Sequence, residues 1–306
     1  MKMTEETENL SPEQELNRIS YFRALNRRKF LTGIGAAGAA AGAAMVLGCT
    51  GGMHDVNAVP PVMAGAPQPA DVLNFALNLE YLEASFYLYA VTGQGLAAAD
   101  MGSGAGTVSG GVAVGDFTPT IKQIAQQIAS DEQTHVQILR GALGSAAVAM
   151  PNLNLAALGS VNNMNLFLLI ARAFEDTGVS AYLGGAGYLA STAISPAAGT
   201  TPALQTAAQI LAIEAYHASN IRQNIIQLGL TAMDKATDSM DVPTSNMDPT
   251  TGALASGAHQ YFCETGGLAI VRTPQQVLNI VYATTGTGIT SGGFYPNGMN
   301  GTIKST

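Results

Sequence analysis

The chain has 306 residues, of which 47% are hydrophobic and only 11% are charged, and its formal net charge is −8 at pH 7. This length suffices for one substantial domain with a core, or at most two smaller ones. The acidic balance, with no basic run after residue 49, argues against a nucleic-acid partner.

Residues 1–49 have the pattern of an export signal rather than of a fold. In NRRKFLTGIGAAGAAAGAAMVLGC, Arg27 and Arg28 precede Phe30, Leu31 and a weakly apolar Gly/Ala run. The pattern is typical of a twin-arginine signal, which directs a folded protein across a bacterial inner membrane. A single transmembrane anchor is the alternative, since about 18 residues span a bilayer. The Gly/Ala richness favours export, to the periplasm or cell envelope.

The end of this segment, VLGC, resembles a lipobox in which Cys49 is acylated and tethers the chain to a membrane. Leu47 is larger than the small residue usual at its position, and ordinary cleavage in the Ala-rich run is the alternative. If Cys49 carries lipid, Cys263 has no partner for an intrachain disulfide. Residues 50–69 contain four prolines and are predicted to form a tether between membrane and domain.

Four bundle-length helices are predicted in the domain over residues 70–230, and no convincing run of alternating strands occurs. The second and fourth helices begin with the same pair, Thr118–Pro119 and Thr201–Pro202, where threonine caps and proline suits the first turn. The first helix is followed by the Gly-rich loop MGSGAGTVSGGVAVGD. The helices are expected at about 70–93, 118–143, 163–190 and 201–229.

These helices form two similar pairs. Aligning the first helix with the third, from Glu80 and Glu175 onward, also matches a serine, a tyrosine and a leucine. Aligning DEQTHVQILR of the second helix with IEAYHASNIR of the fourth matches a glutamate, a histidine and an arginine. An internal repeat of helix pairs is the economical explanation.

Glu80 raises the main chemical question. It lies on the apolar stripe that the first helix is expected to bury, and Glu175 lies on the matching stripe of the third helix. An unpaired buried carboxylate costs many kcal/mol unless it is neutralised, paired or bound to a metal. Only seven Lys and Arg residues remain after residue 49, too few to pair with a cluster of such acids.

The second and fourth helices each carry Glu-x-x-His on an apolar stripe, and residues three apart on a helix point to the same side. With six Glu and four His after residue 49, chance predicts roughly 0.1 such motifs, and two occur. One Glu from each of two helices and Glu-x-x-His from each of the other two is the pattern of di-iron and di-manganese carboxylate bundles. Buried hydrogen-bonded pairs are the alternative. The predicted metal ligands are Glu80, Glu132, His135, Glu175, Glu214 and His217.

Glu83 is the ambiguous acid. It lies one turn from Glu80 and could replace or supplement it, but its counterpart in the second pair is Gly178, so the repeat selects Glu80. Tyr87 and Tyr182 could hydrogen-bond ligand carboxylates or transfer electrons, or serve only as core aromatics.

The residues beside the ligands also allow two interpretations. Asp131 and Asp176 adjoin predicted ligands and are expected to support them or to lie on the surface. Arg140 and Arg222 either pair with such acids or reach solvent from the helix ends. Two further histidines are expected to be exposed and uninvolved: His54 and His259.

These motifs resemble the ferritin-like superfamily, in whose first helix a ligand Glu is followed seven residues later by Tyr, as in NLEYLEASFYLY. Residues 267–283, GLAIVRTPQQVLNIVYA, and 292–301, GGFYPNGMNG, resemble the C-terminal segment of desiccation-related proteins. The resemblance implies an all-α fold: a ferritin-like four-helix bundle of two similar helix pairs, a short C-terminal helix and long loops. Residues 231–306 are then an extension packed on the bundle.

The short helix is also indicated by its residues. Thr273–Gln276 has a capping-box pattern, and Val277, Ile280 and Val281 form an apolar face. Residues 231–266 are expected to be a long, structured loop region.

By resemblance, Glu132 and Glu214 bridge two metal ions, and the other four ligands complete the coordination. Carboxylates and imidazoles without thiolates suit iron or manganese, and zinc fits by affinity. The leading hypothesis is an exported di-metal oxidoreductase acting on O₂ or peroxide, of ferroxidase, peroxidase or catalase type. The alternative is a non-enzymatic envelope stress protein with a structural metal site. Mineral storage is disfavoured, because a tethered chain with a large extension would not readily close into a cage.

Overall fold

The structure is a computed structural model that describes residues 67–190, 203–244, 261–265 and 267–306. The predicted signal, nearly all of the tether, and Cys49, His54 and His259 lie outside the described residues. Among the helices that are described, none has both the length and the apolarity of a membrane span.

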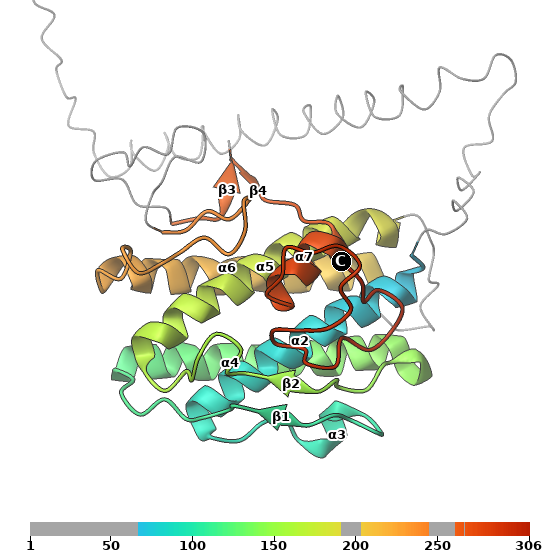
Figure 1. The fold of residues 1–306 in the computed structure, drawn as a ribbon, viewed down its shortest axis with the longest axis horizontal. Helices are drawn as coiled ribbons and strands as arrows, with labels where there is room; N and C mark the ends of the chain where they lie inside the picture. Colours follow the sequence, from blue (N-terminus) through green and yellow to red (C-terminus); the bar gives the residue numbers. More distant parts are fainter. Residues whose placement is uncertain (1–66, 191–202, 245–260, 266) are drawn as a thin grey trace, which may run out of the picture. The chain divides into compact units, whose positions relative to one another are not determined.

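Four long helices form the bundle, as predicted (Figure 1). α2 lies along α4, α5 lies along α6, and α2 also contacts α5, whereas α4 and α6 make few direct contacts. The two closely packed pairs are the two halves of the repeat. The helices span Pro69–Thr92 (α2), Pro119–Leu143 (α4), Met164–Ala190 (α5) and Ala203–Gln227 (α6).

The helix ends follow the expected local chemistry. The Thr118 hydroxyl accepts a hydrogen bond of 3.3 Å from the Ile121 amide, and Pro119 occupies the first turn of α4. α2 ends at Gly93, whose φ of 75° is a left-handed conformation that glycine adopts without strain. The expected cap of α6 at Thr201–Pro202 lies outside the described residues.

The Gly-rich segment after α2 is more ordered than the expected loop. It contains the short helix α3 (Ala98–Met101) and strand β1 (Val108–Ser109), which pairs in parallel with β2 (Leu153–Asn154). Glycine allows this close approach, because a Cβ on Gly110 would lie 2.5 Å from that of Ala156. A second small pair, β3 (Glu264–Thr265) and β4 (Leu268–Ala269), is antiparallel, and a single 3₁₀ turn covers Gly144–Ala146.

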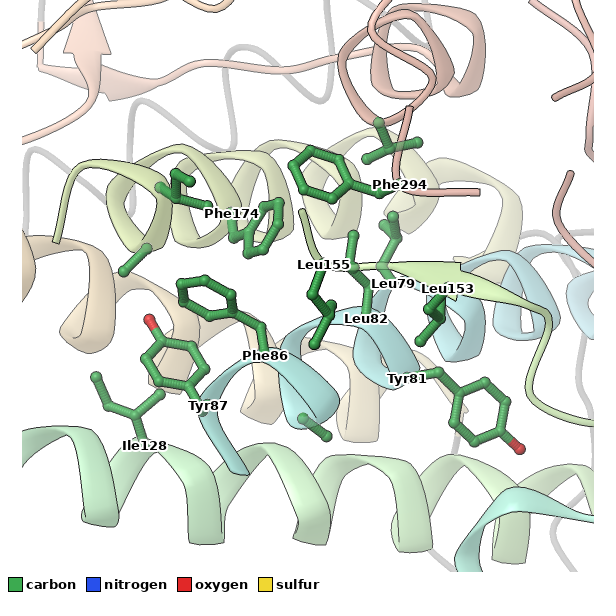
Figure 2. Packing of buried hydrophobic residues seen from close by; sticks show 14 of the residues in the cluster. Leu79, Tyr81, Leu82, Phe86, Tyr87, Ile128, Leu153, Leu155, Phe174 and Phe294 are labelled. Atoms are coloured by element: carbon green, nitrogen blue, oxygen red, sulfur yellow. The ribbon is translucent and has the colours of Figure 1, made fainter. Parts of the chain in front are cut away.

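Aromatic side chains fill the core between the helix pairs (Figure 2). The ring of Phe86 on α2 stacks on Phe167 of α5, with centroids 5.2 Å apart, and meets Phe174 edge to face. Phe174 in turn contacts Phe294 of the C-terminal segment, with centroids 4.9 Å apart. This core holds the elements that carry the predicted ligands in fixed relative positions.

The C-terminal segment packs on the bundle. Helix α7 (Pro274–Val281) begins with the predicted capping box, in which Thr273 and Gln276 exchange side-chain to backbone hydrogen bonds. Beyond α7, the Tyr295 hydroxyl donates a 2.7 Å hydrogen bond to the Asn78 carbonyl within α2. The Asn300 amide donates to the side chain of the same asparagine.

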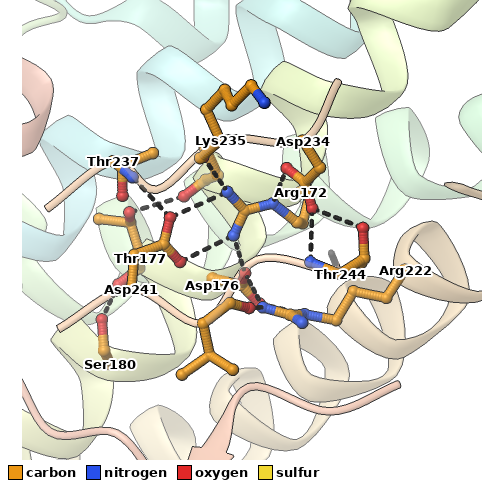
Figure 3. A network of polar contacts seen from close by, with 12 residues as sticks. Arg172, Asp176, Thr177, Ser180, Arg222, Asp234, Lys235, Thr237, Asp241 and Thr244 are labelled. Carbon is orange, nitrogen blue, oxygen red and sulfur yellow. Dashed lines mark hydrogen bonds and ion pairs between the residues drawn. The ribbon is translucent and has the colours of Figure 1, made fainter. Parts of the chain in front are cut away.

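A buried cluster of arginines and aspartates joins α5 and α6 to residues 234–244 (Figure 3). Arg172 is 1% exposed and donates at 2.7 to 2.9 Å to three aspartates. Arg222 pairs with one of these aspartates, Asp176. Pairing with such an acid was one of the two alternatives predicted for Arg222. We call this set the arginine cluster: Arg172, Asp176, Arg222, Asp234 and Asp241.

Candidate metal centre

The four helices bring all six predicted ligands together in the interior of the bundle. Each residue of a group offers one ligand atom, and the atoms of a group all lie within 4.8 Å of one another. Glu132 and Glu214 belong to both groups. These are the two residues expected to bridge the metal ions. The first group is Glu80, Glu132, His135 and Glu214, and the second is Glu132, Glu175, Glu214 and His217.

The two imidazoles face these carboxylates with the same ring nitrogen. His135 Nδ1 lies 3.3 Å from oxygens of Glu80, Glu132 and Glu214. His217 Nδ1 lies 3.0 Å from Glu132 and 3.3 Å from Glu175. Several of these contacts are close enough for ion pairing but are not aligned for hydrogen bonds.

Several buried atoms therefore have no hydrogen-bond partner, although buried polar groups are normally satisfied. They fit a pair of cations, because they belong to the two overlapping groups of closely spaced ligand atoms and are of types that Fe and Mn accept. Two divalent ions would also balance the four carboxylates in charge. Within the two ligand groups, the unpartnered atoms are Glu80 Oε2, Glu132 Oε1, Glu175 Oε2, both oxygens of Glu214, and His217 Nδ1.

The pKa values show how crowded the negative charge is. Burial, reinforced by Glu132, raises the pKa of Glu80 to about 7, although His135 opposes the shift. Burial also raises the pKa of Glu214 well above its usual value. Glu132 behaves oppositely: burial alone would raise its pKa, but the nearby His135 and His217 imidazoles, with a hydrogen bond from His135, hold it below the ordinary range.

The imidazoles are the positive partners of this cluster. Burial alone would lower the pKa of His217, but Glu175 and Glu132 raise it to about 12. A metal ion needs the neutral imidazole and the ionised carboxylate. Metal binding at this centre is therefore expected to release protons.

Two tyrosines hydrogen-bond to predicted ligands across the repeat. Tyr87 of α2 donates to Glu175 of α5, and Tyr182 of α5 donates to Glu80 of α2. Burial raises the pKa of both phenols well above the usual value, so they stay protonated and able to donate. Of the expected alternatives, the structure shows hydrogen bonding to carboxylates that are predicted ligands.

Glu83 lies outside both groups but remains beside them. It is 4% exposed, and burial together with the charge of Glu214 raises its pKa well above the usual value. Its counterpart is glycine for a steric reason, since a Cβ on Gly178 would lie 2.3 Å from Glu214 Oε2 and 3.4 Å from Glu83 Oε1. The repeat therefore has glycine opposite Glu83, because Glu83 and Glu214 already fill the space that a side chain at position 178 would need.

Gly178→Ala is expected to displace the Glu214 carboxylate and weaken metal binding by at least about tenfold. The matched control is Gly187→Ala on the same helix, where an added Cβ meets nothing within 4 Å. Metal titration of both purified variants, with circular dichroism to verify folding, tests this expectation. Equal affinity in Gly178→Ala and the control would contradict it.

Two cavities lie between α4 and α6, and each is lined by one histidine of the centre. A cavity of about 240 Å³ is lined by His217, and one of about 200 Å³ is lined by His135. Asp131 and Ile213 line both cavities. Cavities of this size beside the two histidines admit small molecules.

The structure defines the contacts of three more charged residues: Asp131, Arg172 and Arg140. Asp131, expected either to support a ligand or to lie on the surface, has an oxygen 3.2 Å from His217 Nε2. Arg172 was not singled out at all, although its spacing of four residues from Asp176 on one helix is a signal for an ion pair. Arg140 donates a 2.6 Å hydrogen bond to the Tyr81 hydroxyl rather than pairing with an acid beside the ligands.

A helical bundle with a buried set of carboxylates and two histidines defines a ferritin-like protein. The chain belongs to the ferritin-like domain family, whose model matches residues 68–227. It is also similar to the ferritin-like catalase Nec2 of Nesocodon mauritianus, with 26% identity over 270 residues that cover 76% of this chain and 84% of the relative. The narrower resemblance to desiccation-related proteins stays a prediction.

Proposed function

We propose that this protein is an oxidoreductase that uses two metal ions, iron or manganese, to act on peroxide or O₂. The observation that carries the proposal is the pair of overlapping buried ligand groups that share Glu132 and Glu214. The name of the similar protein, a ferritin-like catalase, favours peroxide disproportionation among the expected activities.

In that reaction two redox metal ions supply a two-electron exchange without release of a radical. One peroxide molecule is oxidised to O₂ and gives up two electrons and two protons. A second peroxide molecule takes up these electrons and protons and is reduced to two molecules of water. The reaction balances with peroxide alone, so it needs no separate electron donor.

The residues of the chain provide the setting for this exchange. The four ligand glutamates are 0% exposed, which excludes bulk water and strengthens their attraction for cations. Tyr87 and Tyr182 each donate to a ligand carboxylate and so restrict its rotation. The cavities beside His135 and His217 suit a substrate of a few atoms.

We further propose that the chain acts outside the cytoplasm, in the periplasm or cell envelope. The support is the sequence around Arg27 and Arg28 and the lipobox-like VLGC that ends in Cys49. Twin-arginine export carries folded proteins, so the cytoplasm would select the metal before translocation.

The test measures the metal content of the native protein by elemental mass spectrometry and O₂ evolution on addition of peroxide. About two iron or manganese ions per chain with O₂ evolution are expected. Glu264→Gln changes a glutamate outside the cluster and is expected to keep both properties. Zinc or no metal, without O₂ evolution, would contradict the proposal and favour the non-enzymatic stress protein.

A further inference from the structure

The two histidines of the centre differ in the contact of the ring nitrogen that faces away from the glutamates. His217 turns Nδ1 toward the cluster, and its other nitrogen, Nε2, lies 3.2 Å from Asp131 Oδ2. The second oxygen of Asp131 accepts a 2.8 Å hydrogen bond from the side-chain amide of Gln127, one turn earlier on α4. Asp131 is thus held in place by one neighbour and directed at the histidine by its position.

The repeat shows that this arrangement exists on one side only. In the alignment of the two Glu-x-x-His helices, Gln127 corresponds to Gln209, but Asp131 corresponds to Ile213. Gln209 and Ile213 both line the cavity at His135, as the repeat requires. Within the described part of the chain, no carboxylate pairs with His135 Nε2.

A carboxylate that accepts the outer N–H of a ligand histidine fixes its tautomer and orientation and makes it a stronger ligand. Loss of such a partner typically weakens metal binding by about 10- to 100-fold. The ligand glutamates of the two groups correspond, since each group has two shared glutamates and one tyrosine-bonded glutamate, and Glu83, whose counterpart is Gly178, lies outside both groups.

We propose that the two metal positions are unequal, and that the position of Glu175 and His217 binds metal first because Asp131 supports His217. Asp131 is a positioning residue, since it acts through the imidazole. The position of Glu80 and His135 then fills second and exchanges its ion more readily. This inference rests on the proposed two-metal centre and adds an order of loading to it.

The arrangement also suggests how to make the positions equal. Ile213→Asp places a carboxylate where the repeat puts the partner of His135, and Gln209 is already present to hold it as Gln127 holds Asp131. Asp131→Asn removes the charge of the existing partner while keeping its size. The side chain of Asp131 is 30% exposed, so this substitution leaves the hydrophobic core intact and acts on the contact with His217.

The experiment titrates the metal-free full chain with Co²⁺ in competition with a chromophoric chelator. The wild type is expected to bind two ions in two distinct steps. Asp131→Asn is expected to weaken the first step by about tenfold or more, to leave the second unchanged, and to alter the visible spectrum of the first ion. Ile213→Asp is expected to strengthen the second step.

Asp100→Asn is the matched control, because it makes the same change of charge beside α4 but contacts Gln133 and Gln137 instead of a histidine. It should leave both steps unchanged, and circular dichroism verifies the fold of every variant. Two bound ions with identical affinities in wild type and Asp131→Asn would overturn the inference but not the proposed function. Equal weakening of both steps would also overturn it, and a wild type that binds no Co²⁺ would overturn both.

Discussion

Glu132→Gln is expected to abolish the binding of both metal ions, whereas Glu80→Gln is expected to leave one. Glu132 belongs to both ligand groups, and its two oxygens face different histidines. A neutral amide at this position removes a charge from each metal position at once. Glu80 belongs to the first group only, so its substitution leaves the group of Glu175 and His217 complete.

The measurement is the number of Fe²⁺ or Mn²⁺ ions bound per chain, by anaerobic titration and by elemental analysis after gel filtration. O₂ evolution from peroxide is expected to fall to the background level in both variants, because the proposed two-electron exchange needs two ions. Glu264→Gln is the control for loss of a glutamate outside the cluster. Two equivalents of metal bound by Glu132→Gln would show that the shared-ligand assignment is wrong.

The ligand cluster could be predicted because its signals are local. Each Glu-x-x-His motif lies within one helical turn, and Glu80 and Glu175 interrupt stripes that are otherwise apolar. Glutamate and histidine are also rare in this domain, which makes their regular placement informative. The helix starts at Thr118–Pro119 and Thr273–Pro274 were found by the same kind of local rule.

The arginine cluster could not be predicted because its contacts are distant in sequence. Arg172 is 62 residues from Asp234 and 69 residues from Asp241, and both aspartates lie in a region that showed only loop character. The pairing of β1 with β2 and the steric role of Gly178 likewise depend on the packed structure.

The arginine cluster accounts for the charge balance of the neighbouring glutamate cluster. Glu175 and Asp176 are neighbours on α5, but adjacent helix residues point in different directions, so one joins the metal centre and the other the arginine cluster. Arg172 and Arg222 form ion pairs with aspartates of the arginine cluster. The glutamate cluster therefore has only its two histidines as positive partners within the described residues, which is the charge setting that two divalent cations complete.

Arg172→Leu is expected to lower the free energy of unfolding by about 3–5 kcal/mol at pH 7, because it leaves the buried carboxylates of Asp234 and Asp241 without their cation, while Asp176 keeps only Arg222. For a domain of this size, the loss corresponds to a fall in melting temperature of roughly 10 °C. Urea unfolding followed by circular dichroism measures it. Lys122→Leu, which removes an exposed cation on α4, is the control and is expected to change stability by less than about 0.5 kcal/mol.

The pH dependence separates this cause from simple loss of packing. Burial alone would raise the pKa of Asp241, but Arg172 holds it below the usual 3.8, so this carboxylate stabilises the wild type above about pH 4 and loses its contribution as pH falls through the lowered value. In Arg172→Leu the buried carboxyl has no cation, and its pKa is expected to rise, so acid neutralises it and removes the penalty. The stability difference between wild type and variant should therefore be largest near pH 7 and shrink toward pH 4. A difference that stays constant over this range would assign the role of Arg172 to packing rather than to charge.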